Sequence, residues 1–235
     1  MLEFGPNPPG RFLFPMNPLL SQEIDGVEKS VLGSLRQKDG LEKDLRKVDN
    51  GLLALDLGCG SGRDVIRLAD RGWNVVGLDS MAKALDRCRN LAERQGIDSR
   101  VHLVHATLSG EGSLVSALTP LLKSVAGKSG METAKFDLIV ISRFHDEKLL
   151  SDIANLLAPG GFILYHTFMM ECSRPTSPDK KLERGYLSKL AISEVGPWKD
   201  ISLTVLRDEV GQVPGANRSG GDPRKLSFFV AQASL

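Results

Sequence analysis

From Gly51 onward, short apolar runs alternate with segments of helical periodicity, and this alternation limits the possible folds more than any other feature. The apolar runs are LLALDL, NVVGLD, VHLVHA, FDLIVI and GFILYHTF. Strands that alternate with helices in this way form βαβ units and a parallel sheet. Two later runs, ISLTVLRDEV and KLSFFVAQA, flank a loop rich in Gly and Pro and predict an antiparallel hairpin. We therefore expect an α/β fold with a doubly wound, mostly parallel sheet that a C-terminal antiparallel hairpin completes.

The first 50 residues differ from this pattern. Five of the 12 prolines lie within the first 18 residues, which excludes a helix or a central strand there. From Ser21 to Val48, apolar residues recur at helical spacing with an interruption at Gly40, which predicts an amphipathic helix that is continuous or broken in two. We expect two parts: residues 1–50 as an N-terminal extension, a lid or a strap, and residues 51–235 as the main domain. Within the main domain, the segment between VHLVHA and FDLIVI is a longer insertion whose middle is predicted to be helical.

Composition excludes several classes of protein. An apolar content of 41% in 235 residues is sufficient for one sizeable core, which excludes a fully disordered chain. Thirty Lys and Arg balance 29 Asp and Glu, so no global charge favours nucleic acid or an anionic membrane. Three cysteines without a signal peptide favour a reducing compartment, and every apolar run is far shorter than the roughly 20 residues of a membrane span. We expect a soluble, cytoplasmic protein.

A glycine-rich loop follows the first predicted strand. The segment Asp56-Leu57-Gly58-Cys59-Gly60-Ser61-Gly62 leads directly into the helical pattern VIRLADRG. Glycines without Cβ atoms let backbone N–H groups and a helix N-terminus face a bound group. Arg63 stands where the dinucleotide fingerprint needs Gly or Ala, and no Gly-Lys-Ser/Thr follows as in a P-loop. The structural alternative is an ordinary tight turn between strand and helix.

The loop resembles motif I of the class I S-adenosylmethionine-dependent methyltransferases, D/E-x-G-x-G-x-G. The second predicted strand ends in Asp79, 21 residues after Gly58, where an acidic side chain can accept hydrogen bonds from both ribose hydroxyls. The alternative role of Asp79 is to cap the helix that begins near Ala82. Pro159-Gly160-Gly161 matches the family's turn before strand five. The resemblance covers about residues 51–235 and implies a Rossmann-like seven-strand sheet and S-adenosylmethionine as cofactor.

The resemblance also implies a set of cofactor contacts. The predicted cofactor-binding residues are Asp56, Gly58, Cys59, Gly60, Gly62, Asp79, Ser80, Ala106, Thr107 and Ser142. After strand three the family often has an acidic residue near the adenine, whereas this chain has His105-Ala106-Thr107. The backbone N–H near Ala106 or Thr107 is therefore the candidate contact to the adenine.

A narrower resemblance concerns the acceptor. DLGCGSGRD, LADRGWNVVGLD, SRFH, APGGFILYHTF and the later Arg174-Pro175 and Glu183-Arg184-Gly185-Tyr186-Leu187 are similar to the branch around the tellurite-resistance methyltransferases, some of whose relatives are fused to a rhodanese domain. This resemblance implies a small-molecule acceptor, a chalcogen oxyanion or a thiol-like group.

Three residues near the ends of strands four and five are candidate catalytic residues. Ser142-Arg143-Phe144-His145 stands where many enzymes that methylate base amines have Asn/Asp-Pro-Pro-Tyr/Phe. Arg143 can hold an anionic acceptor, and His145, with His166 nearby, can take a proton or orient the nucleophile. The alternatives are a salt bridge from Arg143 to Asp146 or Glu147, a helix cap or surface position for His145, and a core position for His166.

Other features leave the acceptor class open. The N-terminal Phe4, Arg11, Phe12 and Phe14 are either an acceptor-selecting lid or a passive strap. The alternatives to a small-molecule enzyme are an RNA or protein methyltransferase and a scaffold that binds S-adenosylmethionine without catalysis. A positive patch would favour RNA or protein, and its candidate members are Arg11, Arg143, Arg174, Lys180, Lys181 and Arg184. Metal binding has little support, because histidines and cysteines show no ligand spacing, and Cys59, Cys88 and Cys172 are expected to have structural roles.

Overall fold

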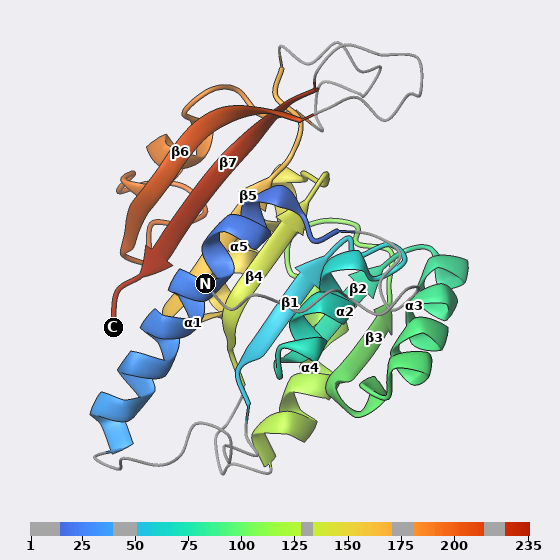
Figure 1. Cartoon of the computed structure of the whole chain (residues 1–235). Helices are drawn as coiled ribbons and strands as arrows, with labels where there is room; N and C mark the ends of the chain where they lie inside the picture. Colours follow the sequence, from blue (N-terminus) through green and yellow to red (C-terminus); the bar gives the residue numbers. More distant parts are fainter. Residues whose placement is uncertain (1–14, 40–50, 128–133, 171–180, 214–223) are drawn as a thin grey trace.

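The computed structural model describes residues 15–39, 51–127, 134–170, 181–213 and 224–235, and these form a sheet between two layers of helices (Figure 1). The strands follow the order β3-β2-β1-β4-β5-β7-β6 across the sheet. Their bounds are β1 Leu53–Leu57, β2 Asn74–Asp79, β3 Val101–His105, β4 Phe136–Ser142, β5 Leu157–His166, β6 Leu203–Val213 and β7 Arg224–Ala233. The pairs from β3 to β5 are parallel, while β7 runs antiparallel to both β5 and β6. The predicted seven-strand, doubly wound sheet with its C-terminal hairpin is thus confirmed.

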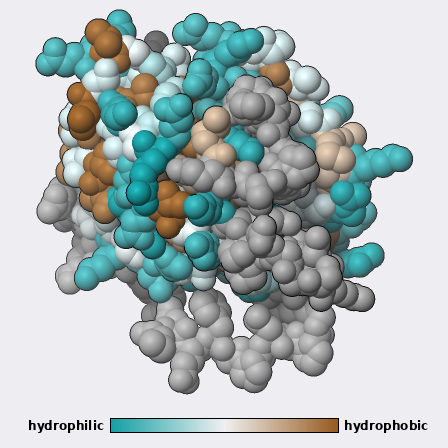
Figure 2. Space-filling model, turned by 90° about the horizontal axis from the view of Figure 1, so that it is seen from above, coloured by the Kyte–Doolittle hydropathy of each residue, from teal (hydrophilic) through white to brown (hydrophobic). Residues whose placement is uncertain are grey.

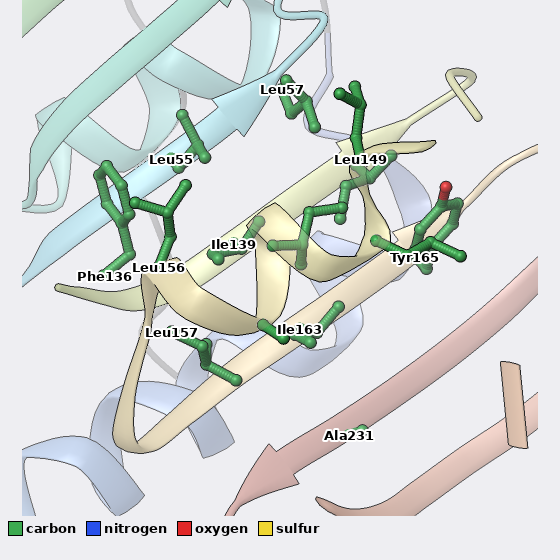
Figure 3. Packing of buried hydrophobic residues seen from close by; sticks show 14 of the residues in the cluster. Leu55, Leu57, Phe136, Ile139, Leu149, Leu156, Leu157, Ile163, Tyr165 and Ala231 are labelled. Atoms are coloured by element: carbon green, nitrogen blue, oxygen red, sulfur yellow. The ribbon is translucent and has the colours of Figure 1, made fainter. Parts of the chain in front are cut away.

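Helices cover both faces of the sheet. The helices are α1 Pro18–Asp39, α2 Arg63–Asp70, α3 Ala82–Gln95, α4 Ser113–Gly127, α5 Leu150–Leu156 and α6 Tyr186–Ala191, with short 3-10 turns at Asp98–Arg100 and Glu147–Leu149. Apolar residues of α1, α2 and α3 pack together on one face, and those of α4, α5 and α6 pack on the other. Figure 3 shows part of the second cluster, to which Leu149 and Leu156 belong together with Ile139 and Ile163 of the central strands. Because both faces are covered, β1 is buried along its whole length.

Helix α1 begins earlier than its apolar pattern predicts. It starts at Pro18, where a proline is tolerated because the first N–H of a helix has no partner within the helix. The Asn17 side-chain oxygen accepts the N–H of Leu19 at 2.9 Å and caps the helix. The prediction that no helix includes the first 18 residues was therefore wrong by one residue, because Pro18 is the first residue of α1. The predicted start of the helical pattern at Ser21 was three residues too late. The expected continuation from Gly40 to Val48 lies outside the described residues.

The insertion after β3 contains helix α4, as predicted. The buried carboxylate of Asp152 in α5 accepts the N–H of Gly112 at 2.8 Å and the N–H of Leu114 at 2.9 Å. These bonds satisfy N–H groups at the start of α4 that have no partner within the helix. The insertion is therefore held against α5 rather than being an independent unit.

The order of the strands places a crevice at the carboxyl ends of β1 and β4. After β1 the chain enters α2 on one face, and after β4 it leads to α5 on the other face. In doubly wound sheets this point, where the direction of winding reverses, is where ligands bind. Figure 2 looks down on this end of the molecule, where the described hydrophobic side chains form separate spots among hydrophilic ones. Among the described residues, no helix is both long and apolar enough to cross a bilayer.

Candidate functional site

The glycine loop after β1 needs its glycines for two different reasons. Gly58, Gly60 and Gly62 all have left-handed backbone angles, with φ of 77°, 57° and 82°. A Cβ at Gly62 would lie only 2.1 Å from the Cys88 sulfur, so this glycine lets α3 pack against the loop. A Cβ at Gly60 would meet no atom within 4 Å. The loop is thus crowded on its α3 side and open at Gly60, where a ligand can approach the backbone.

Asp79 at the end of β2 holds the loop in place. One carboxylate oxygen accepts the N–H of Gly60 at 2.8 Å, and the other accepts the N–H of Met81 at 2.8 Å, just before α3. The cap-like contact that the sequence offered as an alternative is therefore present. It does not exclude ligand binding, because each carboxylate oxygen can accept a second hydrogen bond.

Two cavities meet at Asp79. The larger cavity, of about 970 Å³, is lined by residues that include Asp56, Arg63, Ser142 and Arg143. The smaller cavity, of about 540 Å³, is lined by residues that include Ala106, Thr107, Leu108 and His145. Both are bordered by Gly58, Asp79, Ser80 and Phe144. An elongated ligand that occupies both cavities must therefore pass Asp79 and Gly58.

A buried polar network forms the wall of the larger cavity. Asp64 at the start of α2 accepts the N–H of Asn17 at 2.8 Å and forms a two-point ion pair with Arg63, at 3.2 and 2.9 Å. Arg63 also donates to the Ser142 hydroxyl at 3.1 Å, so the starts of α1 and α2 are joined to the end of β4. Burial, and then the charge of Asp64, raise the pKa of Asp56 well above its ordinary value. Sequence reasoning used Arg63 only to exclude a dinucleotide motif and missed Asn17 and Asp64. Asp64 could have been found from the sequence, because an acidic residue in the first turn of a helix is favoured by the helix dipole.

Arg143 has a backbone angle that is unusual for its residue type. Its φ of 57° lies in the left-handed region, and it is the one non-glycine residue with positive φ among those described. Its backbone N–H donates to the carbonyl of His166 at 2.8 Å, which ties the end of β4 to the end of β5. Its side chain is exposed and borders the larger cavity. Such strain, of about 1–2 kcal/mol, persists only where the surrounding structure holds it.

His145 lies on the other side of the crevice. It is only 4% exposed, its Nδ1 shares a 2.7 Å hydrogen bond with the Tyr165 hydroxyl, and its ring meets Tyr165 and Tyr186 edge-on. The alternative of a surface position or helix cap does not apply, since His145 is buried and Asp146 caps the following turn by accepting the N–H of Lys148 at 3.0 Å. The structure thus places Arg143 and His145 on different cavities. The sequence did not reveal that the Tyr165 hydroxyl, visible at the end of the cluster in Figure 3, is the partner of His145.

His166 is buried with one ring nitrogen fixed and the other without a partner. It is 1% exposed, and its Nδ1 lies 2.8 Å from the Ser227 carbonyl, which can only accept a hydrogen bond. Nδ1 therefore carries the proton and Nε2 presents a lone pair. Nε2 is buried and has no hydrogen-bond partner in the described structure. Burial lowers the pKa of His166 from 6.5 to about 4, so the ring is neutral at pH 7.

The lowered pKa of His166 predicts a loss of stability in acid. The unfolded chain takes up this proton near pH 6.5 and the folded protein only near pH 4, so folding is opposed as the pH falls between these values. We expect His166 to account for a loss of up to about 3 kcal/mol in the free energy of unfolding by pH 4. Urea denaturation at pH 7, 6 and 5 of the wild type and His166→Asn measures it, since Asn retains a donor toward Ser227 but does not titrate. If the free energy of unfolding fell equally with pH in the two proteins, the lowered pKa of His166 would be contradicted.

The described cysteines are structural. Cys59 and Cys88 are buried, and burial raises the pKa of both thiols, that of Cys88 to about 12. Neither is a nucleophile at neutral pH. Several predicted acceptor-side residues lie outside the described residues, namely Phe4, Arg11, Phe12, Phe14, Cys172, Arg174 and Lys180.

Comparison with known proteins agrees with this geometry. The profile of methyltransferase domains matches residues 54–161, which run from β1 into the start of β5. The chain thus contains a methyltransferase domain over this stretch. It is 27% identical to an uncharacterised protein of Schizosaccharomyces pombe over 99% of this chain and 66% of that protein. It is 34% identical to the tRNA 5-carboxymethoxyuridine methyltransferase of Escherichia coli over 36% of this chain and 33% of that enzyme. The chain thus spans two thirds or less of the length of these relatives.

Two solved structures share the fold. TehB from Haemophilus influenzae superposes with a TM-score of 0.54 at 14% identity, over 84% of this chain and 65% of TehB. A methyltransferase from Methanosarcina mazei superposes with a TM-score of 0.52 at 16% identity, over 83% of this chain and all of the other. At these identities the likeness shows the fold alone.

The residues of the crevice fit the cofactor of this family, S-adenosylmethionine. The molecule combines adenine, ribose and a methionine chain, and the two cavities provide an elongated space with a carboxylate, Asp79, at their junction. A Cβ at Gly60 would meet no atom within 4 Å, so the loop has free space at this position. Ala106 and Thr107 border the smaller cavity, and Asp56 and Ser142 border the larger one. Of the predicted cofactor residues, all but Gly60 and Gly62 line one of the two cavities, and Gly62 faces Cys88.

Proposed function

We propose that this protein transfers the methyl group of S-adenosylmethionine to a small-molecule acceptor that binds in the larger cavity beside Ser142 and Arg143. The observation that supports this most strongly is the pair of cavities that meet at Asp79. In the proposed arrangement, Asp79 binds the ribose, residues 106–107 flank the adenine, and Asp56 and Ser142 face the methionine part. His145 then belongs to the adenine side, where it positions the chain after β4 through Tyr165.

The cofactor supplies an activated methyl group on a sulfonium, so the protein mainly has to position the acceptor. Alignment at near-attack distance is worth about 7–11 kcal/mol, which removes the need for a strong base. The Arg143 guanidinium can hold an anionic part of the acceptor through two parallel hydrogen bonds. The side chain of His166 lines neither cavity, so in this proposal His166 acts on the acceptor side through its backbone carbonyl, which accepts the Arg143 N–H at 2.8 Å.

The experiment that tests this proposal follows a labelled methyl group. The purified chain is incubated with methyl-labelled S-adenosylmethionine and a lysate separated into small molecules, RNA and protein. We expect label in the small-molecule fraction, including a chalcogen oxyanion or thiol if the narrower resemblance holds. Label in RNA alone, the class on which the Escherichia coli relative acts, or in protein alone would contradict the small-molecule proposal. Binding without transfer to any fraction would identify a scaffold.

Arg143→Gly is expected to change stability and turnover in opposite directions. Glycine adopts a φ of 57° without strain and keeps the N–H that donates to His166, so the free energy of unfolding should rise by about 1 kcal/mol. The turnover of Arg143→Gly should fall, because the guanidinium is lost. The turnover of Arg143→Lys should also fall, since an ammonium cannot form two parallel hydrogen bonds. Urea denaturation and steady-state kinetics with the acceptor found above measure the two effects. A Gly variant with wild-type turnover would remove Arg143 from the acceptor site.

A further inference from the structure

The larger cavity extends away from the predicted cofactor contacts along the groove between α2 and α3. These helices lie side by side on the same face of the sheet (Figure 1). Arg87, Asn90, Leu91 and Arg94 of α3 line the cavity, at the spacing of one helix face. Arg63 and Arg67 of α2, one turn apart, line it from the other side. None of the arginines at positions 67, 87 and 94 has a role in the cofactor site described above.

The charge of this cavity is predominantly positive. Its described lining contains five arginines, at positions 63, 67, 87, 94 and 143, against three carboxylates, Asp56, Asp64 and Asp79. Asp64 is engaged by Arg63 and Asn17, and burial opposes ionisation of Asp56. Burial also lowers the pKa of Arg67 despite the nearby Asp70 and Asp64, so an added anion would stabilise its charge. The whole chain is almost neutral, at +1, and the excess of positive charge is therefore local.

One contact connects this groove to the glycine loop. The Nε of Arg87 donates to the Ser61 hydroxyl at 2.9 Å, which directs this guanidinium toward the loop at the N-terminus of α2. By contrast Arg89, two residues further along α3, forms an ion pair with Asp86 at 2.9 Å and does not line the cavity. The same helix thus has arginines that face the groove and one that faces away from it.

We infer that the arginines of the α2–α3 groove form a subsite for phosphate groups of the methyl acceptor. The inference rests on the proposed methyl transfer, since it places these groups in the cavity that Ser142 and Arg143 also border. Arginine suits this ligand because its planar guanidinium pairs with two phosphate oxygens. The phosphates belong either to a phosphorylated small molecule or to RNA, and both present the same chemistry to the groove.

The test measures binding of two probes, tripolyphosphate and a fluorescent single-stranded oligouridylate of eight nucleotides, at several KCl concentrations. The test variant carries two changes, Arg87→Gln and Arg94→Gln. The control is Arg89→Gln, which removes one charge from the same helix. We expect the double variant to bind the probe at least about tenfold more weakly, and Arg89→Gln to bind like the wild type. For RNA, the slope of log K against log salt should become shallower by about 1.4, since each phosphate contact on a single strand contributes about 0.7.

The pattern of binding decides between the outcomes. Binding of tripolyphosphate alone supports a phosphorylated small molecule, and binding of the oligonucleotide supports RNA. The inference is overturned if neither probe binds at low salt, or if Arg89→Gln weakens binding as much as the double variant. Titration of S-adenosylmethionine into the same proteins separates the phosphate site from the proposed function. A wild type that binds phosphate but no cofactor contradicts the proposed function and retains only the phosphate site. If the double variant loses binding of the cofactor as well, the single variant Arg94→Gln is tested. Weaker phosphate binding by Arg94→Gln supports the inference, and unchanged phosphate binding overturns it.

Discussion

Replacement of Gly62 by Ala is expected to lower the free energy of unfolding by about 2–5 kcal/mol. A left-handed backbone costs a residue with a Cβ about 1–2 kcal/mol, and forced overlap in a packed interior costs about 1–3 kcal/mol more. Both apply here, since φ is 82° and the new Cβ would lie 2.1 Å from the Cys88 sulfur. Urea denaturation monitored by circular dichroism measures the loss.

Two matched variants separate strain from crowding. Gly96 also has a left-handed φ, of 67°, but a Cβ there would meet no atom within 4 Å. Gly96→Ala should therefore lower the free energy of unfolding only by the cost of the left-handed backbone, about 1–2 kcal/mol. Cys88→Ala in the Gly62→Ala background should restore part of the stability by removing the sulfur. If Gly62→Ala costs no more than Gly96→Ala, the close packing of α3 against the loop is wrong.

Asp79→Ala is expected to weaken binding of S-adenosylmethionine by about 10- to 150-fold. A charge-assisted hydrogen bond is worth about 1.5–3 kcal/mol, and the carboxylate also holds the Gly60 N–H that shapes the loop. The variant should lose some stability as well, because the N–H groups of Gly60 and Met81 lose their acceptor. Calorimetric titration gives the affinity, and thermal denaturation gives the stability.

Asp86→Ala is the matched control for this variant. Asp86 is an exposed carboxylate of α3 that pairs with Arg89 and does not line either cavity. Its removal should leave the affinity for the cofactor unchanged. A folded Asp79→Ala protein with wild-type affinity would reduce Asp79 to a brace of the loop and of the start of α3.

Most of the fold could be predicted because it depends on local patterns. Apolar runs separated by helical periodicity predicted the parallel strands, and the glycine loop with Asp79 marked the crevice at their ends. The start of α1 was misplaced because Pro18 is tolerated at the first helical position and Asn17 caps the helix.

The acceptor side depends on contacts between distant residues, which no local pattern reveals. The left-handed turn at Arg143 sends Arg143 and His145 to different cavities, although they are two residues apart. The tautomer of His166 is set by the carbonyl of Ser227, 61 positions away. The link between Asn17 and Asp64 spans 47 positions. The first of these contacts comes from the pairing of β5 with β7, and the second from the packing of α1 beside α2.

The most direct test of the account is a calorimetric titration of the purified chain with S-adenosylmethionine and, separately, with NAD. We expect saturable binding of S-adenosylmethionine at one site and no binding of NAD. We also expect thermal stabilisation, since a ligand at 100 times its Kd adds about 2.7 kcal/mol to the free energy of unfolding. Binding of NAD without binding of S-adenosylmethionine would contradict the assignment of the crevice.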